Sequence, residues 1–88
     1  MASIKNLKKD INYVLGDIIE ECYAWELTNP KADTNASEAI IEEAIEAFDT
    51  LIDMLHTKNV ENKKVHFREV ENSLEATANK LIENVNKL

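Results

Sequence analysis

The chain has 88 residues, enough for one small domain, and its apolar content of 44% is too high for a disordered chain. Seventeen acidic residues against ten basic ones give a net charge of −7, so phosphate backbones repel the protein and nucleic-acid binding is disfavoured. A single glycine and a single proline leave little turn chemistry, which favours a few long elements.

The N-terminal segment lacks both an unbroken apolar stretch and a small-residue cleavage site, and no apolar run is long enough to span a membrane. Cys22 is the only cysteine, so no internal disulfide can form and a reducing compartment suits the chain. We therefore expect a cytoplasmic protein without a membrane partner.

A first helix is expected from about residue 3 to residue 28. Ser3 is the predicted N-cap, and Pro30 ends the helix because it pushes Asn29 out of the α conformation. Apolar residues recur at steps of three and four, which is the period of one helical face. This main stripe consists of Ile4, Leu7, Ile11, Val14, Leu15, Ile18, Cys22 and Trp25.

The same helix carries more apolar surface than one face requires. Ile19, Tyr23 and Leu27 form a second stripe beside the main one, and Tyr13 lies nearly opposite the main stripe at about 100° per residue. Gly16 costs about 1 kcal/mol relative to alanine in a helix, but it allows another helix to approach closely. We predict an interface at these five residues; for the two tyrosines, an exposed side chain with a hydrated hydroxyl is an equal alternative.

A second helix is expected from about residue 36 to residue 58. Asn35 followed by Glu38 predicts a capping box, with Ser37 as the rival N-cap, and Asn59 suits the left-handed position after the helix. The apolar residues of this helix are Ile40, Ile41, Ala44, Ile45, Phe48, Leu51, Ile52 and Leu55.

A third helix is expected from about residue 61 to residue 87. Lys63 and Lys64 interrupt the apolar pattern near its start, so this boundary is the least defined of the three. The pattern is typical of helix bundles, because apolar residues recur every seven positions at Val60, Phe67, Leu74, Leu81 and Leu88.

Short connections favour antiparallel neighbours. The sequence therefore predicts an all-α protein, a single domain over residues 1–88 that forms an antiparallel up-down-up three-helix bundle. Dimerisation could complete its thin core. The structural alternative is a helical hairpin that assembles with a second chain, if the second helix continues into the third.

The second helix also carries regularly spaced carboxylates, at Glu42, Glu43, Glu46, Asp49 and Asp53. This pattern resembles the acidic helices of all-α nucleotide pyrophosphohydrolases of the MazG and dUTPase type. The resemblance implies Mg²⁺ held by carboxylates that bind substrate phosphates. It covers about twelve residues, and the matching acidic group that the family has on the preceding helix is broken here.

The helical wheel argues against such a site. With Ile40 at zero, the apolar residues of the second helix centre near about 70°, whereas Glu42, Glu46, Asp49 and Asp53 cluster near about 210°. The carboxylates should therefore face water unless an oligomer covers them.

Two other patterns give little support for chemistry. Asp53 and His56 have the spacing of a metal-binding pair, but His66 is the only other histidine and further ligands are missing. Cys22 lies on the main stripe, where a free cysteine usually behaves as a core residue. We predict no catalytic residue, no cofactor and no metal.

Charge should be uneven along the bundle. Antiparallel folding gathers basic residues of the first helix and of the second connection at one end, and carboxylates of the first two helices at the other. We expect a dipolar bundle; the same pattern could serve only to select the register of the helices.

The excess apolar surface of the first helix favours a non-enzymatic protein that acts through protein–protein association, as a homodimer or with another protein. The alternatives are a metal-dependent nucleotide pyrophosphohydrolase-like protein that uses the carboxylates of the second helix, or an acidic inhibitor of a basic partner.

Overall fold

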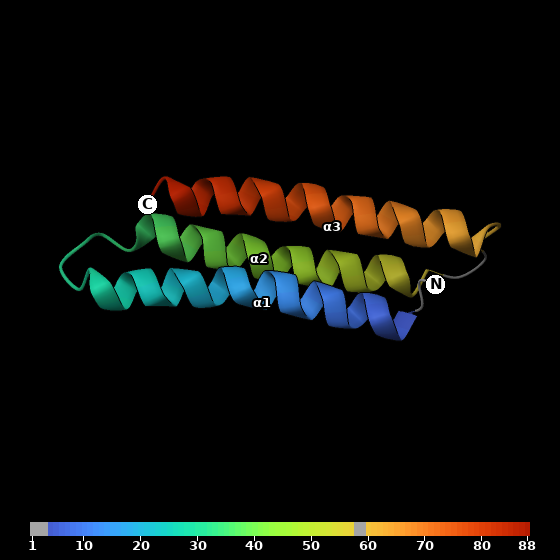
Figure 1. Cartoon of the computed structure of the whole chain (residues 1–88), viewed down its shortest axis with the longest axis horizontal. Coiled ribbons are helices and arrows are strands. Elements are labelled where there is room, and N and C mark those ends of the chain that lie inside the picture. The colour runs from blue at the N-terminus through green and yellow to red at the C-terminus, as the bar shows by residue number, and fades with distance from the viewer. Residues whose placement is uncertain (1–3, 58–59) are drawn as a thin grey trace.

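The computed structural model describes residues 4–57 and 60–88. It contains α1 (Ile4–Thr28), α2 (Asn35–Leu55) and α3 (Lys63–Asn86), with no strand in the described ranges. Figure 1 shows the three helices side by side, with the chain reversing direction at each connection. Each helix contacts the other two, and the bundle is a thin rod of 51 × 18 × 17 Å. The predicted all-α three-helix bundle is confirmed.

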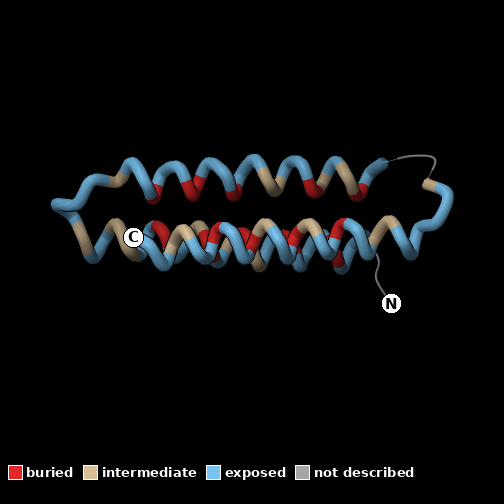
Figure 2. The backbone as a smooth tube through the Cα atoms, turned by 90° about the horizontal axis from the view of Figure 1, so that it is seen from above, coloured by how far each residue is buried: buried red, intermediate tan, exposed pale blue. Residues whose placement is uncertain are grey.

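The core lies along the axis of the rod. Figure 2 shows α2 lying over the α1–α3 pair, with buried positions on the sides that face one another. Burying a Leu or Ile side chain contributes about 1.5–3 kcal/mol, so these apolar stripes supply most of the stabilisation. The buried hydrophobic residues are Leu7, Ile11, Leu15, Ile18, Cys22, Ile40, Ile41, Ala44, Leu51, Leu55, Val70, Leu74, Ala78 and Leu81.

The start of α2 differs from the prediction. The N-cap residue is Thr34 rather than Asn35 or Ser37, so the predicted capping box is wrong. Asp33 takes over the capping role, because its Oδ1 accepts a hydrogen bond from the Asn35 amide at 2.9 Å. A carboxylate here also suits the positive end of the helix dipole.

The end of α2 lies at Leu55, a turn earlier than predicted. The His56 amide still donates to the Ile52 and Asp53 carbonyls, and the Thr57 hydroxyl donates to the Asp53 carbonyl at 3.3 Å. These bonds satisfy carbonyl groups that the last helical turn would leave open. Two sequence predictions, Ser3 as N-cap and Asn59 as the left-handed residue, lie outside the described residues.

The start of α3 is fixed by Asn62, whose side-chain oxygen accepts a hydrogen bond from the Val65 amide at 3.2 Å. Helix three therefore begins after residue 61, and Val60 precedes it as a half-buried residue. His66 ties this turn to α2, since its Nε2 lies 2.6 Å from the Met54 carbonyl oxygen and donates to it. Helices α2 and α3 are thus separate, and the continuous-hairpin alternative is wrong for this fold.

Replacing the cap of α3 should lower stability by a defined amount. We expect Asn62→Ala to reduce the free energy of unfolding by about 1 kcal/mol, because the Val65 amide loses its acceptor. Asn72→Ala, at an exposed position within α3, is the control and should leave stability unchanged or slightly raised. Urea unfolding followed by circular dichroism measures both. Equal effects of the two variants would contradict the capping role.

Candidate functional site: the face between α1 and α2

A shallow apolar hollow lies on the surface where α1 and α2 run side by side. Its volume is about 200 Å³. Ile45 at its edge is 51% exposed although it belongs to the apolar arc of α2. The lining residues are Asn12, Leu15, Gly16, Ile19, Ala44, Ile45 and Phe48.

The hollow follows from the width of the apolar arcs of the two helices. On α1, Gly16 and Ile19 lie about 100° from the centre of the buried stripe, and on α2 Ile45 lies about 90° from its centre. These flanks meet along one side of the bundle, while α3 packs against the other side of the same stripes. We call the exposed strip formed by Gly16, Ile19, Tyr23, Ile45 and Phe48 the α1–α2 face.

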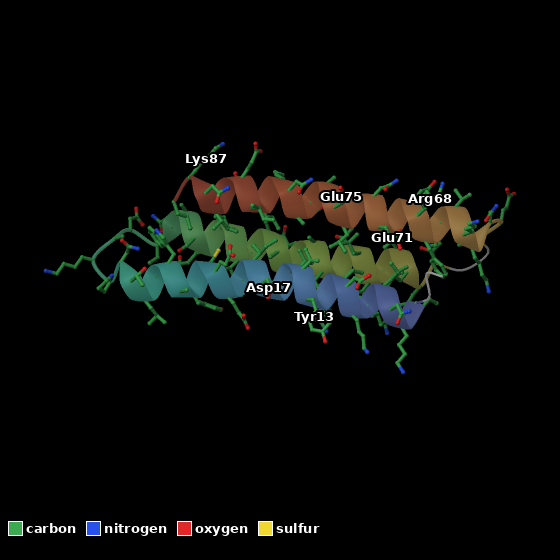
Figure 3. The ribbon with its side chains drawn as sticks, viewed as in Figure 1. Tyr13, Asp17, Arg68, Glu71, Glu75 and Lys87 are labelled. Carbon is green, nitrogen blue, oxygen red and sulfur yellow. The ribbon has the colours of Figure 1, made fainter. Side chains whose placement is uncertain are left out.

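The structure places the predicted interface residues in three settings. Gly16 and Ile19 come together in the hollow, and Tyr23, one turn further along α1, is 53% exposed. Leu27 is 82% exposed in the last turn of α1. Tyr13 is 68% exposed and does not line the hollow; Figure 3 shows it projecting from α1 away from the other two helices.

Sequence reasoning missed the contribution of α2 to this face. It placed Ile45 and Phe48 in the apolar stripe of the second helix, without separating core from edge. Phe48 is half-buried against the core, whereas Ile45 is half exposed. The available signal was angular position, since Ile45 sits at the margin of the apolar arc and next to the carboxylates.

Gly16 stands open within this face. A Cβ atom built on it would meet no heavy atom within 4 Å, so no other helix of the chain approaches it closely. The close approach that its missing side chain allows is therefore not used inside the bundle. A helix interior gains nothing from glycine by itself, because glycine is the weakest helix former after proline.

The other two grooves between helices are more polar. The α2–α3 hollow is larger, at about 490 Å³, but Glu43, Glu46 and Lys80 line it. The α1–α3 hollow, of about 310 Å³, is lined by carboxylates at Asp10, Glu71 and Glu75. The α1–α2 hollow has no charged residue in its lining, and this distinguishes it as a candidate contact surface.

The carboxylates that resemble a pyrophosphohydrolase helix lie on the outside of α2. Glu42, Glu46, Asp49 and Asp53 are all exposed, as is His56. In the part of the chain that the structure describes, no group of three or more His, Cys, Asp or Glu residues could hold a metal ion. These acidic residues therefore act on the surface as charge rather than as a ligand set in this arrangement.

One buried polar contact joins the end of α1 to the start of α2. The Ser37 side chain is fully buried, and its hydroxyl lies 3.1 Å from Glu26 Oε1 and 3.0 Å from the Thr34 carbonyl oxygen. A serine hydroxyl has one hydrogen, so the two acceptors share it. This contact pins the first connection and accounts for Glu26, a carboxylate that would otherwise be available to a site.

Cys22 is buried in the core. Burial raises the pKa of its thiol, and the nearby carboxylates of Glu26 and Glu21 raise it further. A thiol with a raised pKa stays protonated near neutral pH and is a poor nucleophile. The residue therefore acts as a small core hydrophobe.

Comparisons with known protein families, with curated proteins and with solved structures give no match to this chain. Among the helices of the described ranges, none is both long enough and apolar enough to cross a membrane. Any function must therefore be argued from the surface of the bundle itself.

Filling the open position at Gly16 should stabilise the single chain. Gly16→Ala adds a methyl group that meets nothing and reduces the freedom of the unfolded backbone, so we expect a gain of about 0.5–1 kcal/mol. Ala76→Gly, at an exposed position in α3, is the reverse control and should cost a similar amount. Urea unfolding at the lowest workable protein concentration measures both. A loss of stability in Gly16→Ala would show that the position is crowded.

The thiol of Cys22 predicts a pH dependence of stability. Because the folded state raises the thiol pKa above its ordinary value of 9.0, the folded state holds the proton more tightly than the unfolded state. This contribution is complete below the unfolded pKa and is lost as pH rises from about 9 through the folded pKa. Compared with Cys22→Ala, the wild type should therefore lose more unfolding free energy between pH 8 and pH 10. Parallel pH profiles for the two proteins would contradict this.

Proposed function

We propose that this protein acts through protein–protein association, with the α1–α2 face as its contact surface and a homodimer as its basic form. The observation that carries the proposal is Ile45, which is 51% exposed beside Ile19 and Gly16 in an uncharged hollow. Contiguous apolar surface of this kind, bordered by polar residues, is typical of interaction sites.

The energetics of a small bundle support association. An 88-residue chain buries only about 60–65% of the surface that its unfolded state exposes, so its stability is small. A second copy that binds only the folded state adds stability by mass action. Each square ångström of apolar surface that it removes from water contributes about 25 cal/mol. A two-fold homodimer is the commonest way for a soluble protein to cover such a surface.

The dimensions of the rod also suit a dimer. One long side of a body 51 Å in length and 18 Å across is about as large as the roughly 800 Å² that each partner contributes to a stable interface. The face would therefore have to be used along most of its length, and not only at the central hollow.

The cytoplasm is the proposed compartment. A reducing environment suits a single thiol that is buried in the core and makes no disulfide.

Charge placed on the face should separate association from folding. We expect Ile45→Glu to weaken dimerisation at least about tenfold, because a carboxylate would have to leave water inside the contact. Val65→Glu is the matched control, since Val65 is also 51% exposed but lies on α3. Sedimentation equilibrium across micromolar concentrations measures both, with circular dichroism to confirm that each variant stays helical.

A second matched pair uses the tyrosines of α1. Tyr23→Glu should weaken the dimer, whereas Tyr13→Glu, on the far side of the helix, should not. A wild-type chain that sediments as a monomer throughout this range would overturn the homodimer. Dimerisation that survives both Ile45→Glu and Tyr23→Glu would show that the contact surface lies elsewhere.

A further inference from the structure

The α1–α2 face has a basic end. Lys5, Lys8 and Lys9 are all exposed, and at about 100° per residue they lie on the same side of α1 as Gly16. Figure 1 places the start of α1 beside the end of α2. Asp53 reduces the positive charge at this end, because it is exposed in the last turns of α2.

The other end of the face is acidic. Glu38 and Glu42 precede Ile45 by seven and three residues, so the helical period places them on the same side of α2 as Ile45. Glu20 flanks Ile19 on α1, and all three carboxylates are exposed. This end lies beside the first connection, where α1 ends and α2 begins (Figure 1). The charge of the face therefore changes sign along the rod, with apolar residues between the two ends.

This order of charges discriminates between the two ways in which a two-fold axis can join such faces. An axis along the helices brings equal ends together, so that acidic groups face acidic groups and basic groups face basic groups. An axis across the helices brings each basic end onto an acidic end, and both contacts are then attractive. The second arrangement is the self-complementary one.

We propose, building on the homodimer proposed above, that two copies pair through the α1–α2 face in antiparallel order. A two-fold axis across the helices lays α1 along the α1 of the second copy and α2 along its α2. The axis crosses α1 near Gly16, which lies midway in the stretch from Asn12 to Ile19 that lines the hollow.

Gly16 suits the crossing point for a steric reason. Its open space is free of any other group of its own chain within 4 Å of the Cβ position, so the backbone of a second α1 can come close there. The open glycine, the uncharged hollow and the opposite charges at the two ends of the face are three separate observations, and each is satisfied by the same antiparallel copy.

Disulfide trapping tests which helices meet. In a Cys22→Ala background, Gly16→Cys should form a disulfide-linked dimer on mild oxidation, because two copies of residue 16 face each other near the axis. Val65→Cys in the same background is the control for random collision, and it should link much more slowly. Non-reducing electrophoresis over a time course gives the two rates.

The opposite arrangement has its own cross-link. If equal ends meet, α1 lies over the α2 of the second copy, so Gly16→Cys would link to Ile45→Cys in an equal mixture of the two variants rather than to itself. Preferential formation of that mixed link over the Gly16→Cys self-link would overturn the antiparallel order.

Salt dependence tests the charges without any cross-link. In the antiparallel dimer the dissociation constant should rise at least about threefold between 50 and 500 mM NaCl, because salt screens attractive pairs. Lys5→Glu combined with Lys9→Glu should weaken the dimer at low salt and reverse its salt dependence. In a dimer with equal ends together, salt would instead strengthen association.

These results separate the two proposals. A chain that never dimerises removes both the homodimer and its antiparallel order. A dimer that is lost in Ile45→Glu, but that tightens with salt and forms the mixed link, keeps the proposed contact face and overturns only the order of the copies.

Discussion

The structure depends on α1 being gripped from two sides. Its main stripe, centred on Ile11 and Cys22, is fully buried because α2 covers one flank and α3 the other. Three helices can bury one stripe on each member, but they cannot bury an arc wider than that. The part of α1 that exceeds this limit emerges on the side of α2, and the α1–α2 face is the result.

The hydrogen bonds at the ends of the helices hold this geometry in register. Ser37 bonded towards Glu26 fixes the first connection, and His66 bonded to the Met54 carbonyl fixes the second. Neither contact touches the face, but both determine how far α2 can slide along α1. The positions of Ile45 and Gly16 relative to each other follow from them.

Much of the fold could be predicted from the sequence, because it rests on periodicity. The buried stripes are those that the three- and four-residue steps mark out, and the interruption at Lys63 and Lys64 coincides with the true start of α3. The cap of α2 was not predictable from the local pattern. Asp33 and Thr34 compete with Asn35 and Ser37 for the same amides, and the choice depends on Ser37 being drawn inward by α1.

The candidate face was predictable only in half. Gly16, Ile19 and Tyr23 could be recognised because α1 has an apolar arc that is visibly too wide. Ile45 could not, since one isoleucine at the margin of an arc is equally compatible with core and surface until the neighbouring helix is placed. Tyr13 was included on residue type, and its position on the opposite side of α1 follows from angle alone.

The odd number of helices has a geometric consequence. Because the chain traverses the rod three times, α1 begins and α3 finishes at opposite ends of a body 51 Å long (Figure 1). Domains or labels attached at both termini would be held apart by a stiff strut rather than brought together. In this respect the bundle is a ready-made spacer, whatever it carries.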